Sequence, residues 1–282
     1  MTIAWVFPGQ GSQKLGMADN LMSLPGSQDR FEFASQLLDR DLLEICRKSN
    51  GSEPLNDLND TRNTQPALFV VESLIVDDLL RQGRNPSLVA GHSLGELVAL
   101  YAAQVFDAQT ALRLLKRRSE LMANSGGGAM TAMIGFDRQE LDDLVSATEG
   151  VVIANDNSSS QVVLSGTPEA VQAVSGALKC KRAIPLNVSG AFHSPAMEEA
   201  SKAFAAELDE LTFQNAKIPV LSNADPTPSC DAELLKRRLK MQMTSGVRWR
   251  ETMERMVIEG ITNLVEIGPG NVLSGLAKRS LQ

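Results

Sequence analysis

The chain has 282 residues, 43% hydrophobic and 22% charged, as in an ordinary globular protein of one large domain or two smaller ones. Its net charge of −7 argues against general nucleic-acid binding. Three scattered cysteines and two histidines argue against a disulfide framework and against a metal site. We find neither an apolar stretch of the ~20 residues that span a membrane nor the basic segment of a signal peptide. We therefore expect a cytoplasmic protein that binds no membrane.

The N-terminal part begins with a strand and a glycine-rich loop. Residues 2–7 are mostly apolar β-formers, and Gln10 follows between Gly9 and Gly11. This pattern predicts a buried strand whose loop lets Gln10 approach a ligand, although many loops of this kind are plain connections. A helix is then expected up to Gln82, with Thr64 as its N-cap.

The stretch from Gly91 to Gly95 has the form G-x-S-x-G, with an apolar run before it and a helix-forming segment after it. Strand, sharp turn, serine and helix in this order are typical of a nucleophile elbow. The glycines would let strand and helix pass close together, and Ser93 would project at the positive end of the helix, where negative charge is stabilised. The simpler alternative is a turn with an ordinary serine.

Arg118 lies on the apolar stripe of the next predicted helix, which runs from Ala108 to about Asn124 with Asp107 as its cap. An arginine that faces the core has to find an anion or extend to solvent. Spacing alone leaves two alternatives open, an internal salt bridge and a clamp for a carboxylate of the substrate.

The pattern changes after the glycines at 126–128. The expected strands are 130–136, 151–155, 161–165 and 183–188, the expected helices are 138–147 and 168–178, and residues 155–160 are expected to form a hairpin loop. The order βαββαβ is that of a ferredoxin-like subdomain. We therefore divide the chain into a core of residues 1–124 and 194–282 and an insert of residues 125–193.

His193 stands directly before a predicted helix that begins with Ser194 and Pro195. The positive end of that helix would disfavour the imidazolium and keep the imidazole usable as a base. The other histidine, His92, lies inside the tight turn and is poorly placed to reach back to its neighbour. If Ser93 is a nucleophile, His193 is therefore its expected base.

Four apolar strands are each followed by a loop with polar or glycine residues. The strands are expected at 2–7, 88–90, 218–223 and 264–267, and their loops carry Gln10, Ser93, Asn223 and the glycines at 268 and 270. In a parallel sheet with crossover helices these loops meet at the carboxyl edge, where ligands bind. The predicted fold class is thus α/β, a parallel sheet interrupted by the insert.

Six motifs occur in order over nearly the whole chain. They are PGQGSQ at 8–13, NTQPA at 63–67, GHSLGE at 91–96, Arg118, AFHSP at 191–195 and EIGPG at 266–270. In this combination the sequence resembles the malonyl-CoA:acyl carrier protein transacylases. The resemblance implies an α/β-hydrolase-like core with a ferredoxin-like insert. It also implies transfer of malonyl from coenzyme A to the phosphopantetheine thiol of acyl carrier protein, for fatty acid synthesis, through a malonyl-serine ester.

The resemblance assigns catalytic roles to four residues. Ser93 matches the acylated serine, and His193 matches its general base. The backbone N–H groups of Gln10 and Leu94 match the oxyanion hole. No cofactor besides the substrates is implied, and we expect a monomer in the cytoplasm, or in the plastid stroma if the source has plastids.

Three more residues match the substrate side of the site. Arg118 matches the arginine that pairs with the malonyl carboxylate, and Gln65 lies in a motif that contributes to substrate binding. Gln242 matches the position whose backbone carbonyl orients the histidine, which would explain why no Asp or Glu presents itself as a third triad member.

Other functions stay open. A serine thioesterase or esterase would use the same elbow but would give Arg118 and Gln10 no task. A non-catalytic carrier-binding subunit would leave Ser93 and His193 unexplained. A malonyltransferase of polyketide synthesis or malonate decarboxylation is not separated by sequence. Candidate contacts for an acidic carrier protein are Arg237, Arg238, Lys240, Arg248, Arg250, Lys278 and Arg279.

Overall fold

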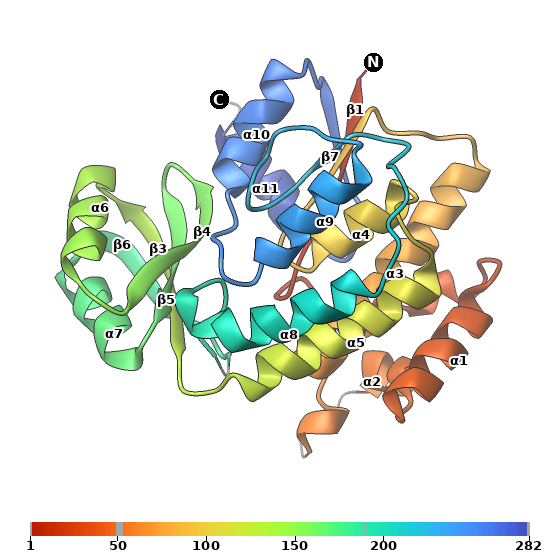
Figure 1. The fold of residues 1–282 in the computed structure, drawn as a ribbon, viewed down its shortest axis with the longest axis horizontal. Helices are drawn as coiled ribbons and strands as arrows, with labels where there is room; N and C mark the ends of the chain where they lie inside the picture. Colours follow the sequence, from red (N-terminus) through yellow and green to blue (C-terminus); the bar gives the residue numbers. More distant parts are fainter. Residues whose placement is uncertain (1, 49–52, 189, 281–282) are drawn as a thin grey trace.

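The computed structural model describes residues 2–48, 53–188 and 190–280, without the side chains of residues 279 and 280. These residues form a parallel sheet surrounded by helices, and a separate antiparallel sheet at one end of the molecule (Figure 1). Residues 1, 49–52 and 281–282 of the predicted core, and residue 189 of the predicted insert, lie outside the described residues. Within the described residues, no helix is long and apolar enough to cross a membrane.

The parallel sheet has the strand order β7-β2-β1-β8. Its strands are β1 (Ile3–Phe7), β2 (Leu88–Gly91), β7 (Val220–Leu221) and β8 (Asn263–Glu266), and every neighbouring pair is parallel. The four strands predicted from apolar runs are thus confirmed, the third of them shorter than expected. Because the strands are parallel, the loops after them lie at one edge of the sheet, as the sequence predicts.

Helices pack on both faces of this sheet. They are α1 (Ser27–Leu38), α2 (Leu42–Lys48), α3 (Thr61–Arg81), α4 (Gly95–Ala102), α5 (Ala108–Asn124), α8 (Glu198–Asp209), α9 (Ala232–Met241), α10 (Trp249–Ile258) and α11 (Val272–Ser280), with 3-10 turns at Asp19–Leu21, Pro54–Asn56 and Pro195–Met197. Helix α5 begins after Asp107, whose side chain accepts a hydrogen bond from the N–H of Thr110. This is the cap that the sequence predicts.

The predicted start of the helix at Thr64 is wrong. Helix α3 begins at Thr61, because the Asp60 carboxylate accepts the N–H of Arg62 and takes the capping position. The hydroxyl of Thr64 instead donates to the carbonyl of Leu58 at 2.6 Å. The earlier start places Gln65 in the second turn of the helix, with its side chain buried.

The antiparallel sheet has the order β4-β5-β3-β6. It consists of β3 (Ala129–Phe136), β4 (Val151–Ser158), β5 (Gln161–Gly166) and β6 (Cys180–Pro185), and helices α6 (Arg138–Ala147) and α7 (Pro168–Ala177) cover one face. A small apolar cluster, which includes Met133, Leu141, Val162 and Val174, lies between the helices and the strands. All predicted elements are present, but two strands differ in their bounds.

Both differences arise from pairing with neighbouring strands. Strand β4 continues to Ser158 through most of the expected hairpin loop, because Asn155 and Asp156 pair with β5 across a bulge. Strand β6 lies about three residues earlier than predicted, because it is set by its pairing with β3, in which Phe136 faces Cys180. The polar residues at 155–158 suggested a loop, but backbone pairing with β5 on one side and with Val247 on the other holds this segment as a strand.

Strand β4 also joins the two sheets. The N–H of Val247 donates to the carbonyl of Ala154 at 2.7 Å, and the N–H of Asp156 donates to the carbonyl of Val247 at 2.9 Å. The carboxylate of Asp156 forms ion pairs with Arg138 of α6 and Arg250 of α10. The antiparallel sheet is therefore fastened to the segment that follows α9.

Candidate active site

Ser93 occupies a tight turn between β2 and α4. Its backbone φ is +54°, in the left-handed region that non-glycine residues rarely adopt. A Cβ atom on Gly91 would lie 1.8 Å from the carbonyl oxygen of Gly95, and one on Gly95 would lie 2.2 Å from the carbonyl oxygen of Phe7. The close approach of strand and helix that the two glycines predict is thus present, with Ser93 at its tip.

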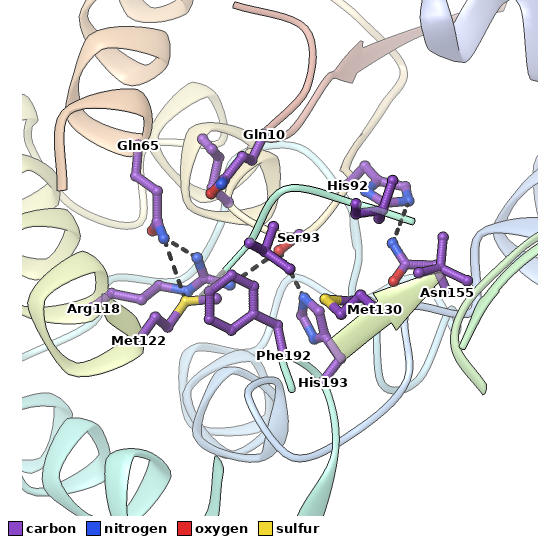
Figure 2. A pocket seen from close by; sticks show the side chains of 14 residues that line it. Gln10, Gln65, His92, Ser93, Arg118, Met122, Met130, Asn155, Phe192 and His193 are labelled. Atoms are coloured by element: carbon purple, nitrogen blue, oxygen red, sulfur yellow. Dashed lines mark hydrogen bonds between the residues drawn. The ribbon is translucent and has the colours of Figure 1, made fainter. Parts of the chain in front are cut away.

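His193 lies opposite Ser93 (Figure 2). The Ser93 Oγ and the His193 Nε2 are 2.8 Å apart. The His193 Nδ1 lies 3.0 Å from the carbonyl oxygen of Gln242 and 3.2 Å from that of Ser245. Since carbonyl oxygens only accept, Nδ1 carries the hydrogen of the neutral imidazole, and Nε2 is left to accept the hydroxyl proton of Ser93.

The imidazole of His193 is kept neutral mainly by burial. Burial, and next the positive charge of Arg118, lower the pKa of His193 to about 3, against hydrogen bonds to the Gln242 and Ser245 carbonyls that raise it. The sequence attributed this neutrality to a helix end. The turn Pro195–Met197 and then helix α8 do follow the histidine, and burial and Arg118 lower the pKa in the same direction. The backbone of His193 also has a positive φ, +57°.

Arg118 is fully buried beside the nucleophile. Its Nη1 donates to Gln65 Oε1 at 2.7 Å, and its Nη2 donates to Gln242 Oε1 at 2.9 Å and to Ser93 Oγ at 3.1 Å. All of these acceptors are neutral oxygens, so within residues 2–48, 53–188 and 190–280 no carboxylate forms an ion pair with the guanidinium. Burial lowers the pKa of Arg118 to about 10, which leaves it positively charged at neutral pH. Of the two alternatives for Arg118, the direct internal salt bridge is therefore wrong.

Gln10 and Leu94 present two free backbone donors next to Ser93. Both residues line the same pocket as Ser93 and His193. Their N–H groups have no hydrogen-bond acceptor among the described residues, and the N–H of Leu94 stands at the N-terminus of α4. The side chain of Gln10 points elsewhere, since its Oε1 accepts the hydroxyl of Thr61 at 2.7 Å.

The pocket lies between the two sheets. Strands β3, β4 and β5 contribute Met130, Asn155 and Val163 to its wall, and the segment after β6 contributes Leu186 and Val188. Phe192 and His193 come from the last residues of the predicted insert, and the other lining residues come from the core: Gln10, Gln65, His92, Ser93, Leu94, Arg118 and Met122. The seven residues predicted for the site lie close together. Six of them line the pocket, whereas Gln242 does not line it and contacts Arg118.

His92 does not contact the hydroxyl of Ser93. Its Nε2 lies 2.8 Å from Asn157 Oδ1 and 3.3 Å from Asn155 Nδ2, both on β4, and its ring packs edge-on against Trp249. The expectation that His92 cannot serve as the base agrees with this geometry. The role of β4 as its partner could not be read from the sequence, because residues 155–157 looked like a loop.

Three further residues support the site from behind. The Oδ1 of Asn223 accepts the N–H of Ser93 at 2.7 Å, and its Nδ2 donates to the carbonyl of Gly91 at 2.6 Å. Glu96, one residue after the elbow glycine, accepts hydrogen bonds from Asn223 and Gln242. Asn223 was placed at the right edge by its strand. Glu96 was noted only as the last residue of the GHSLGE motif, with no role assigned to it, and nothing in the sequence singled out the carbonyl of Ser245.

Most of the basic residues proposed to meet a carrier protein are already paired. Arg238 is buried against Asp225, Lys240 pairs with Asp209, Arg248 with Glu251, and Arg250 with Asp156 and Glu254. Arg237 and Lys278 are exposed, and the side chain of Arg279 lies outside the described part of the chain. Most of the positive charges of the predicted basic face are thus already paired with carboxylates of the same chain.

Comparison with known proteins agrees with this geometry. The acyl transferase domain family matches residues 4–282. The malonyl CoA-acyl carrier protein transacylase of Synechocystis sp. is 47% identical over 280 residues, which are 99% of this chain and 94% of that protein. Its crystal structure superimposes with a TM-score of 0.95, covering 100% of this chain and 94% of the other.

A second solved structure has a partner bound. It is a malonyl-transacylase in complex with its type II polyketide synthase acyl-carrier protein, 38% identical, with a TM-score of 0.91 and a coverage of 100% of this chain and 93% of the other. Both comparisons extend over the parallel and the antiparallel sheet. This chain is therefore an acyltransferase, and it belongs to the malonyl-CoA:acyl carrier protein transacylase family.

Proposed function

We propose that this chain transfers a malonyl group from malonyl-CoA to the phosphopantetheine thiol of acyl carrier protein and thereby supplies fatty acid synthesis. One observation carries the proposal most directly: a serine–histidine pair shares its pocket with a fully buried arginine whose hydrogen-bond acceptors are all neutral. The pair supplies a nucleophile, and the arginine supplies a charge that matches the free carboxylate of a malonyl thioester.

The first half-reaction acylates Ser93. His193 Nε2 takes the hydroxyl proton while Ser93 Oγ attacks the thioester carbonyl, and the resulting oxyanion is held by the N–H groups of Gln10 and Leu94. Collapse of this intermediate breaks the carbon–sulfur bond. The thiolate of coenzyme A leaves and receives the proton from His193.

The second half-reaction runs the same steps in reverse. The thiol of the carrier protein gives its proton to His193 and attacks the malonyl ester, and Ser93 leaves with that proton. Each product leaves before the next substrate binds, so we expect ping-pong kinetics. No cofactor takes part in these steps.

Arg118 selects the acyl group. A malonyl carboxylate would form a bidentate pair with the guanidinium, whereas an acetyl thioester would leave that buried charge unpaired. The cost of stranding one partner of such a pair is about 2–5 kcal/mol. Gln65 and Gln242 hold the guanidinium in place for this contact.

The finer description of the fold is part of the proposal. The strand order β4-β5-β3-β6, with two helices on one face, supports a ferredoxin-like insert of residues 125–193 in an α/β-hydrolase-like core of residues 1–124 and 194–282. The elbow after β2 supports the hydrolase-like core. The cytoplasmic or plastid stromal location and the monomeric state remain predictions.

The test is the mass of the intact protein after mixing with malonyl-CoA or acetyl-CoA. Wild type should gain one malonyl group, Ser93→Ala should gain none, and Arg118→Ala should lose the preference for malonyl over acetyl. Release of free malonate at a comparable rate without carrier protein would instead support the thioesterase alternative. Absence of any adduct and of turnover would leave only the non-catalytic alternative.

A further inference from the structure

A second buried charge lies behind Arg118, and no step of the mechanism uses it. Glu96 stands in the first turn of α4 and is 1% exposed. Its Oε2 accepts the side-chain N–H of Gln242 at 2.8 Å and the backbone N–H of Asn223 at 3.1 Å. The other carboxyl oxygen, Oε1, has no partner in good hydrogen-bond geometry among the described residues, although the hydroxyl of Ser222 lies close enough to the carboxyl group to lower its pKa.

The carboxyl group of Glu96 and the backbone carbonyl of Ser93 together dictate how the amide of Gln242 is turned, since its Nε2 donates to Glu96 Oε2 at 2.8 Å and to the Ser93 carbonyl oxygen at 2.9 Å. Because Oε2 of Glu96 can only accept from the amide, the NH2 end of Gln242 has to face Glu96, and its oxygen then faces the Nη2 of Arg118 at 2.9 Å. The reversed amide would direct N–H groups at a cation and an oxygen at a carboxyl oxygen. Burial raises the pKa of Glu96, but the orientation holds in both protonation states, because Oε2 already accepts two N–H groups and a proton would reside on Oε1.

The orientation matters because the same amide holds the guanidinium from the side opposite the pocket. Gln65 is oriented in a similar way, since its NH2 donates to Thr61 Oγ1 and its oxygen accepts from Arg118. Two amide oxygens thus fix Arg118 without neutralising it. A carboxylate in direct contact would compete with the carboxylate of the substrate, whereas Glu96 acts from one amide further away.

We propose that Glu96 is a positioning residue for acyl-group selection, which fixes the amide of Gln242 so that its oxygen holds Arg118 toward the pocket. This inference rests on the proposed function, since it concerns how Arg118 distinguishes malonyl from acetyl thioesters. Glu96 acts through Gln242 and touches no substrate atom.

The test compares kcat/KM for malonyl-CoA and acetyl-CoA in Glu96→Met and Glu96→Gln. Glu96→Met removes the acceptor at similar volume, and we expect the malonyl-to-acetyl ratio to fall by about tenfold or more, as for the loss of a hydrogen bond to a charged group. Glu96→Gln still offers an oxygen to Gln242 and Asn223, and its ratio should stay within about threefold of wild type.

Glu72→Met is the matched control. Glu72 is also a fully buried glutamate, but neither of its oxygens has a hydrogen-bond partner in the part of the chain that the structure describes, and so neither bonds to Arg118, Gln242 or Ser93. The substitution makes the same change of side chain in the same core, so its ratio should equal that of wild type. If Glu96→Met does not fold, Gln242→Leu supplies the second measurement and should lower the ratio as well.

Three outcomes would overturn the inference. The first is an equal loss for both acyl donors in Glu96→Met, which would assign Glu96 to the elbow through Asn223. The second is a loss of the ratio in Glu96→Gln as large as in Glu96→Met, and the third is an unchanged ratio in Gln242→Leu. In an Arg118→Met background, Glu96→Met should lower the ratio no further.

Failure of the proposed function would look different. In that case wild type itself would form no malonyl adduct on Ser93, or Arg118→Met would keep the wild-type ratio. The inference about Glu96 fails only where both of these hold as proposed and the Glu96 variants do not follow.

Discussion

Ser93 and His193 are held in conformations that cost free energy. Both have φ near +55°, which is unfavourable for residues with a Cβ atom and persists only where the surroundings enforce it. The surroundings are visible here. Asn223 fixes the N–H and the strand end of the elbow, and two carbonyl oxygens fix the imidazole. The hydroxyl of Ser93 and the imidazole of His193 are thus held 2.8 Å apart without a bound substrate.

The pKa of His193 predicts an unusual pH profile. Since its pKa is lowered to about 3, the imidazole remains a free base far below its ordinary pKa of ~6.5. We therefore expect kcat/KM for the transfer of an acetyl group to Ser93 to decrease with falling pH only below about pH 5. The acetyl adduct is measured by mass after rapid quench. In Arg118→Met this decrease should move to higher pH, because the charge that contributes to the low pKa is gone. A wild-type decrease near pH 6.5 would contradict this account.

Glu72 predicts a stability that falls as the pH rises. Burial, and next the charge of Glu266, raise the pKa of Glu72 well above 4.5, so the folded protein keeps it protonated while the unfolded chain releases the proton above pH 4.5. The unfolded state then binds fewer protons, so this group lowers the free energy of unfolding by about 1.4 kcal/mol per pH unit from pH 4.5 up to the raised pKa of the folded state. Glu72→Gln should remove this dependence. Urea unfolding of both proteins at pH 5, 6 and 7 checks it, and parallel curves would contradict it.

Residue types predicted the chemical groups of the site better than their supports. Ser93 stood out by its G-x-S-x-G turn, His193 could be paired with it because the chain has only two histidines, and Arg118 stood out as a charge on an apolar stripe. Glu96 gave no such signal, since a glutamate in the first turn of a helix is common as a favourable charge at the helix end. Its burial depends on packing that one strand or helix does not determine.

At the scale of elements, the turn that carries Ser93 requires glycine at position 91, because no room is left there for a Cβ atom. In Gly91→Ala the new methyl group would overlap the carbonyl of Gly95, so we expect loss of at least ~3 kcal/mol of stability, or no folded protein, and loss of Ser93 acylation. Gly176→Ala is the matched control. That glycine is exposed in α7 with no atom near its Cβ position, and the alanine should stabilise by about 0.5–1 kcal/mol.

Thermal unfolding and the malonyl adduct of both variants decide the matter. A Gly91→Ala protein that folds and is acylated as fast as wild type would show that strand and helix can separate. The start of α5 was predicted correctly because its cap, Asp107, was recognised, whereas the start of α3 was missed because Thr64 was taken for the cap in place of Asp60. The bounds of β4 and β6 were missed because their pairing partners decide them. Such partners come from distant parts of the chain and leave no local pattern.

At the scale of the whole molecule, β4 connects the small sheet to both catalytic loops. It contacts His92 beside the nucleophile, and it pairs with Val247 close to the carbonyls that orient His193. The two sheets are therefore not independent walls of the pocket. Their relative position is part of the catalytic geometry.

Asp156 tests this connection. Asp156→Ala leaves Arg138 and Arg250 without their shared carboxylate, and we expect a loss of about 1–3 kcal/mol of stability together with slower acylation of Ser93. Glu254→Ala is the control, because it removes only a surface ion pair of Arg250 and should cost less than about 0.5 kcal/mol. Urea unfolding and acylation rates measure both effects. Equal behaviour of the two variants would show that β4 does not need this anchor.

The backbone carbonyls that hold His193 have a consequence for how such an enzyme can change over time. A single substitution can remove a triad carboxylate, whereas a backbone carbonyl group is present whichever residue occupies the position. The site is thus vulnerable to insertions and deletions that redirect the segment between Gln242 and Ser245, and it tolerates point substitutions that keep its course. A search for three catalytic side chains would overlook the arrangement. Its third member is a backbone group, whose position depends on the course of the chain and not on the type of any one residue.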